Sequence, residues 1–185
     1  MAKLTDSMLD HLLSAAITGH IDEDDPDLRP LGAHVSEPLF RGLQFPRDKL
    51  VVGGIISQWG DCSHWSVDSN CAEYFAQHCD YEQVIDWVAE EKCLARNVAE
   101  AMMKLTPVVL ELRGADNAIE TGRLLGENVD RIHEIPEGSG YETLSEMWDN
   151  LLPEKEVTIF DSDFIIRKVM EPDMNRIVHV HVTQK

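Results

Sequence analysis

The chain has 185 residues, 43% hydrophobic and 27% charged, enough for one globular domain with a sizeable core or a main domain with a small helical appendage. With 16 Lys and Arg against 34 Asp and Glu, its formal net charge is −18. Such a field repels nucleic acid and anionic membranes and attracts basic partners, so direct nucleic-acid binding is not expected and a phosphate-bearing ligand needs a local cation.

Neither the apolar runs nor the cysteines point to a membrane or a metal. No apolar stretch approaches the about 20 residues of a membrane span, and the first six residues lack a signal peptide's apolar core. We therefore expect a cytoplasmic protein without a membrane partner. The four cysteines, Cys62, Cys71, Cys79 and Cys93, contain no CxxC pair. We accordingly expect reduced thiols and no metal site.

The first part of the chain predicts a helix followed by strands. Apolar residues recur at helical spacing over 4–18, with Thr5 or Asp6 as N-cap. An acidic loop follows, and we expect residues 1–30 to form a unit of N-terminal helix and loop, separate from the domain over 31–185. Short strands are predicted at 39–43 and at 51–57, the latter with a glycine pair that can bend it.

The remaining residues predict helices and then strands. A helix starts near Ser69 with Asp68 or Ser69 as its cap, and a longer helix is expected over 81–105. The later elements are a buried strand at 107–114, a polar stretch at 116–150 with a short helix at 142–150, and strands at 156–160, 163–169 and 177–183. Without a regular βαβ rhythm, this order predicts an α+β fold.

Three motifs stand in a fixed order along the chain. They are Leu39-Phe40-Arg41-Gly42-Leu43, Trp65-Ser66-Val67-Asp68 and Glu154-Lys155-Glu156-Val157-Thr158-Ile159. In the third, two carboxylates are spaced i, i+2 at the mouth of a predicted strand, which puts them on one face about 7 Å apart. Carboxylates held in this way can divide the chemistry, one stabilising a cation in the transition state and the other positioning a nucleophile.

The order and spacing of these motifs resemble the Arg-Ser-Glu class of mono-ADP-ribosyltransferases, which occurs in bacterial toxins and bacteriophages. The resemblance covers residues 39–183. It implies split antiparallel β-sheets with flanking helices, with residues 31–185 as the catalytic domain. It also implies that NAD is the substrate and that ADP-ribose passes to arginine on a protein target, a basic one given the acidic surface. The site of action would be the host cytoplasm if the chain is phage-encoded.

The resemblance also implies roles for five residues. In the family, the arginine matching Arg41 holds the NAD phosphates and ribose, and the glycine matching Gly42 lets backbone groups reach the nicotinamide amide. The serine matching Ser66 hydrogen-bonds the catalytic glutamate, which matches Glu156 and stabilises the ribosyl cation. The glutamate matching Glu154 is associated with transfer to arginine.

The chain departs from the family pattern in places. Val67 and Asp68 replace a threonine and a second serine, although aspartate caps a helix as well as serine does. Tyr141 and Trp148 lie in the segment equivalent to the family's target-binding loop, and for Trp148 core packing is an equal alternative. The aromatic that stacks on nicotinamide has no counterpart in 115–140, which lacks Phe, Trp and Tyr.

Other interpretations remain open. The NAD-binding cleft that the resemblance implies would serve an NAD glycohydrolase or a transferase with a non-protein acceptor equally well. The acidity of the chain alone would suit a non-enzymatic decoy. A thiol nucleophile built from Cys62 or Cys71 with His64 lacks an orienting partner in the sequence. His179 and His181 alternate with valines, which indicates an exposed strand face better than metal ligands.

Overall fold

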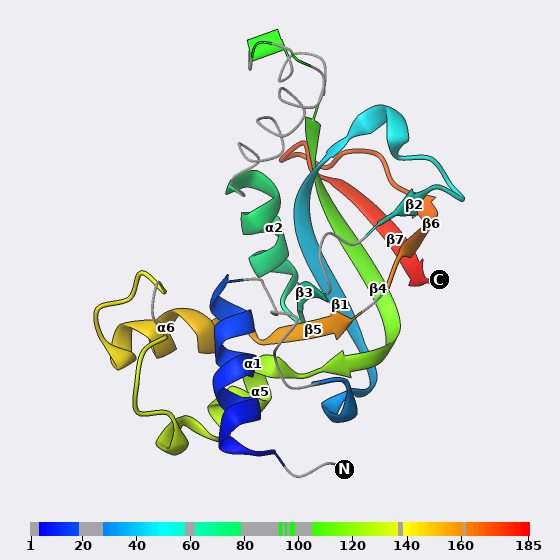
Figure 1. Ribbon diagram of the computed structural model, residues 1–185. Helices are drawn as coiled ribbons and strands as arrows, with labels where there is room; N and C mark the ends of the chain where they lie inside the picture. The colour runs from blue at the N-terminus through cyan, green and yellow to red at the C-terminus, as the bar shows by residue number, and fades with distance from the viewer. Residues whose placement is uncertain are drawn as a thin grey trace.

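The computed structural model describes residues 4–18, 28–57, 62–78, 93, 95, 97–98, 105–136, 139–160 and 162–185. The acidic loop at 22–27 and nearly all of the helix predicted over 81–105 lie outside these ranges. In Figure 1 the described helices α1, α5 and α6 lie together on one side of the strands, and α2 lies beside β1.

The helices and strands confirm a mixed α+β architecture. The helices are α1 (Asp6–Thr18), α2 (Ser69–His78), α5 (Thr121–Gly126) and α6 (Leu144–Glu154). The strands are β1 (Ala33–Pro46), β2 (Ile55–Ile56), β3 (Cys62–Ser66), β4 (Leu105–Ile119), β5 (Glu156–Phe160), β6 (Phe164–Val169) and β7 (Val178–Gln184). None of the helices in the described ranges is long and apolar enough to cross a lipid bilayer.

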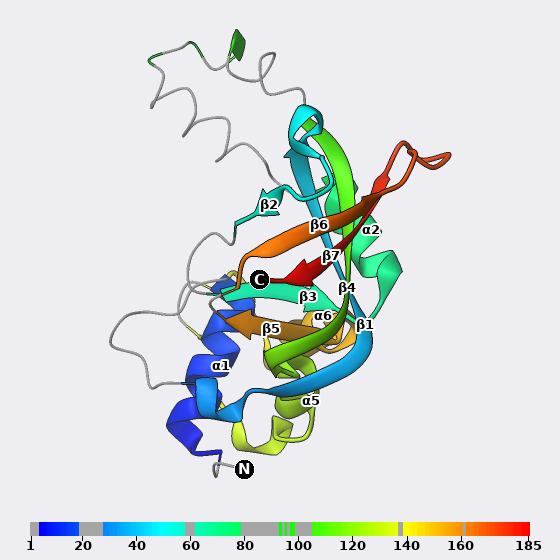
Figure 2. The same cartoon turned by 90° about the vertical axis from the view of Figure 1, so that its right-hand side faces the viewer.

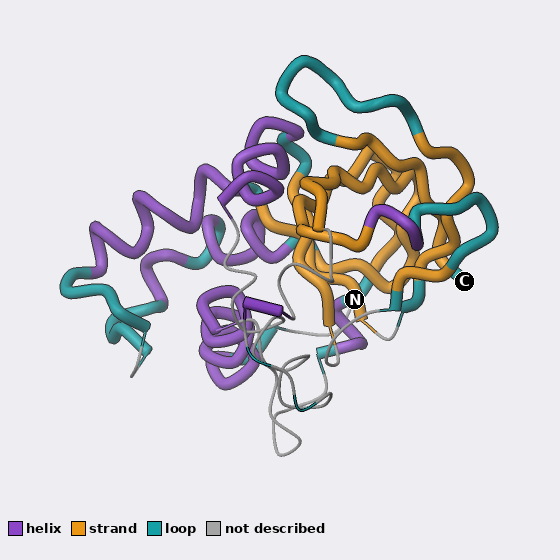
Figure 3. The backbone as a smooth tube through the Cα atoms, turned by 90° about the horizontal axis from the view of Figure 1, so that it is seen from above, coloured by secondary structure: helices purple, strands orange, loops and turns teal. Residues whose placement is uncertain are grey.

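The strands form one sheet that partly closes on itself. Their order is β1-β3-β5-β4-β7-β6-β2, and β1 also pairs with β4, so β1, β3, β5 and β4 make a closed ring. Every pairing is antiparallel except that of β4 with β7. Seen from above, the strands surround a central space with helices to one side (Figure 3). The predicted antiparallel sheet with flanking helices is therefore confirmed.

Two predicted helix caps are present. The Met8 amide donates to Thr5 Oγ1 at 3.2 Å, which satisfies a free amide in the first turn of α1. The Asn70 amide donates to Asp68 Oδ1 at 2.9 Å and caps α2 in the same way. The local sequence thus determines where both helices begin.

Two predictions for irregular segments are wrong. The strand predicted over 51–57 is reduced to Ile55–Ile56, because the chain turns at Gly53, whose φ is +85°, and leaves Val52 69% exposed. The polar stretch at 116–150 was expected to hold one short helix near its end. That helix is present as α6, but the stretch before it was wrongly expected to be irregular, because it begins with the last residues of β4 and then forms α5.

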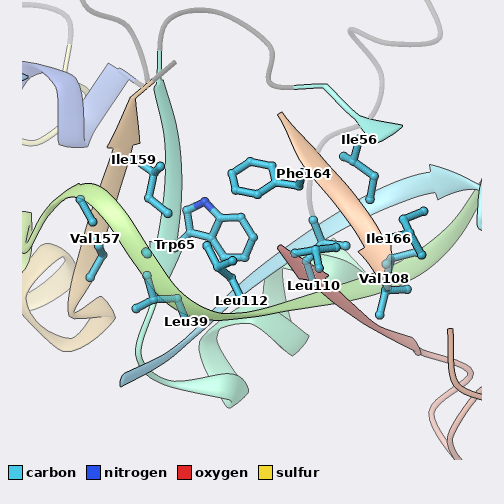
Figure 4. Close-up of a cluster of buried hydrophobic side chains, with 14 of the residues drawn as sticks. Leu39, Ile56, Trp65, Val108, Leu110, Leu112, Val157, Ile159, Phe164 and Ile166 are labelled. Carbon is cyan, nitrogen blue, oxygen red and sulfur yellow. The ribbon is translucent and has the colours of Figure 1, made fainter. Parts of the chain in front are cut away.

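One hydrophobic core fills the interior of the sheet. Trp65 and Phe164 lie at its centre, with ring centroids 4.9 Å apart (Figure 4). Leu39 of β1, Leu110 of β4 and Ile159 of β5 are fully buried around them. These residues come from strands on every side of the ring, so this core fixes the register of the strands that carry the site.

A second core joins the helices to the sheet. Leu12 of α1, Leu125 of α5 and Met147 of α6 pack together with Phe160 of β5. Trp148 packs against the same cluster, which favours the core alternative for that residue. Helix α1 lies alongside α5 in both Figure 1 and Figure 2. The first helix thus shares its core with the rest of the chain, while the division near residue 30 stays a prediction.

Candidate active site

Three neighbouring strands bring the three motifs together. Phe40 of β1 pairs with Ser66 of β3, and Ser66 in turn pairs with Glu156 of β5. One step further along, His64 pairs with Thr158. Cross-strand partners share a face, and so do residues two apart on one strand. The sheet therefore presents His64, Ser66, Glu156 and Thr158 on the same side.

Helix α2 packs directly on β1 at Gly42. A Cβ atom at this position would lie 1.8 Å from the main-chain oxygen of Ala72 and 2.5 Å from the amide nitrogen of Ala76. The side-chain amide of Gln44 donates to the Ala76 carbonyl at 2.6 Å across the same contact. In this chain the glycine of the first motif therefore has a packing role, because only glycine lets the helix approach the strand so closely.

A cavity of about 430 Å³ opens beside these elements. All five residues predicted for the site line it: Arg41, Gly42, Ser66, Glu154 and Glu156. The remaining lining residues are Ala16 and Ile17 at the end of α1, Phe40, His64, Trp65, Cys71, Ala72, Phe75, Tyr141 and Leu151. Segments far apart in the sequence thus meet around one hollow, which has the size of a small-molecule site.

The two carboxylates of the third motif reach the cavity by a different route from the one predicted. Glu154 is the last residue of α6, and Lys155 caps that helix in the left-handed region with φ 46° and ψ 50°. Strand β5 begins only at Glu156. The expectation that the two acids share a face of one strand is therefore wrong. They line the same cavity because the chain turns sharply at Lys155.

Glu156 is buried, and two side chains contact one of its carboxyl oxygens. The residue is 8% exposed. Its Oε1 atom lies 2.8 Å from His64 Nδ1 and accepts a hydrogen bond of 3.1 Å from Thr158 Oγ1. The Thr158 hydroxyl lies 2.7 Å from that of Thr121, and both threonines are fully buried. Because an ionised carboxylate only accepts, Nδ1 carries a hydrogen when it bonds this group.

Ser66 makes a different hydrogen bond from the one that the family resemblance implied. Its hydroxyl donates to the main-chain oxygen of Glu154 at 2.5 Å and accepts from the Asp68 amide at 2.9 Å. The single hydroxyl hydrogen is thereby used, so the expected bond from this serine to the side chain of Glu156 is absent here. Ser66 instead ties the start of α2 to the end of α6.

Burial and charge change the acidity of two further groups in the cavity. Burial raises the pKa of Glu154, the negative charge of Glu156 raises it further, and His64 partly opposes the shift. Burial also raises the pKa of the Cys71 thiol, and the neighbouring Glu154 adds to the effect. A thiol that holds its proton is a poor nucleophile, so the alternative based on Cys71 loses support.

Several cavity residues were not identified as site residues from the sequence. His64 lines the cavity, and Thr158 is buried outside the lining and contacts Glu156. Both could have been found, because each lies two residues from a predicted site residue on a predicted or observed strand. Tyr141, one residue beyond the segment 115–140 that lacks aromatic residues, lines the cavity, as does the end of α1. No local signal marks Ala16 or Ile17, because their positions depend on how α1 packs in the second core.

Comparisons with known proteins give structural matches only. The sequence matches no protein-family model and no curated protein. Among solved structures, the ADP-ribosyltransferase Vis toxin from Vibrio splendidus is 14% identical with a TM-score of 0.41, over 82% of this chain and 49% of that chain. Complexes of Vis with the M6 inhibitor and with agmatine give 13% and 12% identity, TM-scores of 0.42 and 0.41, and the same 82% of this chain. These matches cover 49% and 50% of the Vis chains, so this chain spans about half of their length. The chain is therefore similar in structure, at low sequence identity, to an ADP-ribosyltransferase toxin.

Proposed function

We propose that this protein is a mono-ADP-ribosyltransferase that cleaves NAD, releases nicotinamide and transfers ADP-ribose to arginine on a protein target. The observation that carries the proposal is the meeting of Arg41, Ser66 and Glu156 around one cavity of about 430 Å³. A guanidinium, a hydroxyl and a buried carboxylate from three distant motifs suit a dinucleotide with a reactive glycosidic bond. A decoy that works by negative charge alone has no need of this arrangement.

Arg41 is proposed to hold the pyrophosphate of NAD. A protein with a net charge of −18 repels a dinucleotide at long range, so binding needs a cation inside the cavity. The guanidinium fork matches two phosphate oxygens at once, which a lysine ammonium does not. Aromatic side chains that line the same cavity, among them Phe40 and Tyr141, offer ring faces for the nicotinamide.

Glu156 is proposed to stabilise the cation that forms when the nicotinamide–ribose bond breaks. The bonding electrons leave with nicotinamide, which is cationic in NAD and neutral when released, so departure needs no general acid. Positive charge develops on the ribose, where a fixed carboxylate stabilises it directly. Because Glu156 is buried, water screens this interaction less than it would at the surface.

Glu154 is proposed to prepare the arginine acceptor. A protonated guanidinium is a weak nucleophile, so transfer requires a group that orients it and removes a proton. Burial and the charge of Glu156 raise the pKa of Glu154, which makes its carboxylate a stronger base than an exposed glutamate. The acidic chain favours a basic protein as the target, and action in the cytoplasm stays a prediction.

The proposal is tested by incubating the purified protein with labelled NAD and a cell lysate. Nicotinamide release is measured, labelled proteins are separated on a gel, and the modified residues are identified by mass spectrometry. The wild type should label arginine. Glu156→Gln, which keeps size and shape but removes the charge, should lose at least about a hundredfold in both nicotinamide release and labelling.

Other results would point elsewhere. Nicotinamide release without any labelled macromolecule would indicate an NAD glycohydrolase, and labelled small molecules or nucleic acid would indicate a different acceptor. Unchanged turnover in Glu156→Gln would remove the catalytic assignment. Binding to basic proteins without any NAD cleavage would favour the decoy.

A further inference from the structure

The hydrogen bonds of Glu156 are one-sided. His64 Nδ1 at 2.8 Å and Thr158 Oγ1 at 3.1 Å both reach the same oxygen, Oε1. Within the described ranges of the chain, no hydrogen bond reaches the other oxygen, Oε2. The terminal torsion of a glutamate is soft and has broad minima, so a carboxyl without such contacts rotates over a wide range. Two donors on one oxygen restrict that rotation.

We propose that His64 is a positioning residue which, together with Thr158, holds Oε1 of Glu156 and so presents Oε2 to the ribose of bound NAD. The inference rests on the proposed function, because it assigns a purpose to this geometry only if Glu156 acts on NAD. These two contacts orient the Glu156 carboxylate before the reaction. A charge stabilises a developing cation only when it is already held in the right place.

The hydrogen bonds of Ser66 explain why His64, and not Ser66, contacts the Glu156 carboxylate. The hydroxyl of Ser66 has one hydrogen, and that hydrogen is donated to the main-chain oxygen of Glu154 at 2.5 Å. His64 lies on the same face of β3, two residues earlier, opposite Thr158 in the pairing with β5. The ring is therefore the nearest donor on that strand whose hydrogen can reach Glu156.

Thr158, the second donor, is itself in contact with the hydroxyl of Thr121. Thr158 donates its single hydrogen to Glu156 and lies 2.7 Å from Thr121 Oγ1, which is also 3.2 Å from the Ile119 main-chain oxygen. With Thr158 donating to Glu156, the Thr121 hydroxyl is the donor in the shorter of its two contacts, the one to Thr158. Both threonines are fully buried, where a hydroxyl without partners would be costly. The contacts Thr121–Thr158 and Thr158–Glu156 thus give both hydroxyls a partner and direct the Thr158 hydrogen at Oε1.

The first experiment compares three variants of His64 by steady-state nicotinamide release. In His64→Asn the amide nitrogen stands where Nδ1 stood, in His64→Gln it is carried one bond further, and His64→Leu has no donor. We expect kcat to fall about tenfold to a hundredfold in the leucine variant, the loss of a hydrogen bond to a charged group. KM for NAD should change less than about twofold because NAD binding is left intact. The kcat of His64→Asn should be close to that of the wild type, and the kcat of His64→Gln should be close to that of His64→Leu.

Three kinetic outcomes would overturn the inference. One is a kcat in His64→Leu equal to that of the wild type. Another is an increase in KM at constant kcat, which would make His64 a binding contact. The third is equal loss in the asparagine and leucine variants, which would mean that the hydrogen bond is not the cause.

A measurement that needs no activity separates this inference from the proposed function. NMR of the imidazole nitrogens in the folded wild type should find a hydrogen on Nδ1 of His64, and Glu156→Ala should shift that resonance while Glu154→Gln leaves it nearly unchanged. A bare Nδ1 in the wild type overturns the contact whether or not NAD is cleaved. A wild type that cleaves no NAD overturns the proposed function and the kinetic role with it. Normal kcat in His64→Leu rejects only the role of His64.

Discussion

The two walls of the cavity differ in how firmly they are held. The strand wall consists of Arg41, Gly42, Ser66 and Glu156, and it is fixed by strand pairing and by the close packing of α2 on β1. The helix wall consists of Glu154 and Tyr141, which lie near the two ends of α6 and are both partly exposed. Two glutamates separated by one residue thus belong to different walls, because the left-handed Lys155 redirects the chain between them.

This difference matches the two steps of the proposed reaction. Breaking the glycosidic bond needs a carboxylate fixed in advance, which Glu156, buried in the strand wall, provides. Transfer needs a base that can also meet an incoming protein, which the more open helix wall permits. Damage to the strand wall should therefore abolish all NAD chemistry, whereas damage to the helix wall should alter transfer, affinity or pH dependence.

The largest effect is expected from Gly42→Ala. The added methyl would lie 1.8 Å from the Ala72 carbonyl, so β1 and α2 have to move apart and the strand wall is disrupted. Overpacking of this kind costs about 3 kcal/mol. We expect the free energy of unfolding to fall by that amount in chemical denaturation, with loss of nicotinamide release. Gly126→Ala is the control, because its methyl meets only the Leu152 side chain at 3.4 Å. Equal stability of the two variants would contradict the packing role of Gly42.

Glu154→Gln should separate transfer from bond cleavage. Removing a general base slows the transfer by about a hundredfold. Nicotinamide release into water should stay within a few-fold of the wild type, since Glu156 is untouched. The two rates are measured in parallel with an arginine-containing acceptor. Equal losses in both would count against a separate role for the helix wall.

The same variant should change the pH profile of transfer. Because the pKa of Glu154 is raised, its carboxylate forms only at a higher pH than an exposed glutamate requires. Wild-type transfer should therefore rise with pH through that raised value, and Glu154→Gln should lack this step. A step that persists unchanged in the variant belongs to another group.

Tyr141 tests the affinity of the helix wall for NAD. Its ring lines the cavity, and a stacking contact with an aromatic base contributes about 1 kcal/mol or more. Tyr141→Ala should raise KM for NAD about five- to tenfold with little change in kcat, and Tyr141→Phe should behave like the wild type. If both variants lose kcat equally, the phenol hydroxyl is the important group and stacking is not.

The smallest expected effect is on stability. The pKa of Glu154 is higher in the folded than in the unfolded state. The stability that its protonated form provides is present in acid and is lost as pH rises through the raised pKa, so the ionised form destabilises the fold. Glu154→Gln should therefore be more stable than the wild type at pH 7, by less than about 1 kcal/mol because the side chain is partly exposed. The difference should vanish in acid, where Glu154 is protonated. A variant that is less stable at pH 7 would contradict the sign of the shift.

Much of the sheet could be predicted from local pattern. The strand predicted at 156–160 is β5 without change, and the alternation of valines with polar residues identifies β7 to within a residue at each end. In β7 every second residue is buried, which the alternating sequence predicts, whereas all five residues of β5 are buried. The glycine pair at 53–54 predicts a bent strand, but Gly53 has a positive φ and turns the chain there.

The five residues proposed for the site stay a prediction, and the structure shows where they lie and which contacts they make. All five proposed residues line the cavity, but the end of α6 was not foreseen, since Pro153 lies inside the last helical turn and a non-glycine residue, Lys155, takes the left-handed cap. The partner of Ser66 lies 88 residues away in the chain. Contacts of that range follow from strand register and helix packing, which no single motif encodes.

The most direct test of the account is a crystal structure of Glu156→Gln with bound NAD. It should show the pyrophosphate on Arg41, the nicotinamide ribose beside residue 156, and the glycosidic bond intact. A dinucleotide bound at another surface, or no binding at millimolar NAD, would contradict the claim that these motifs form one active site.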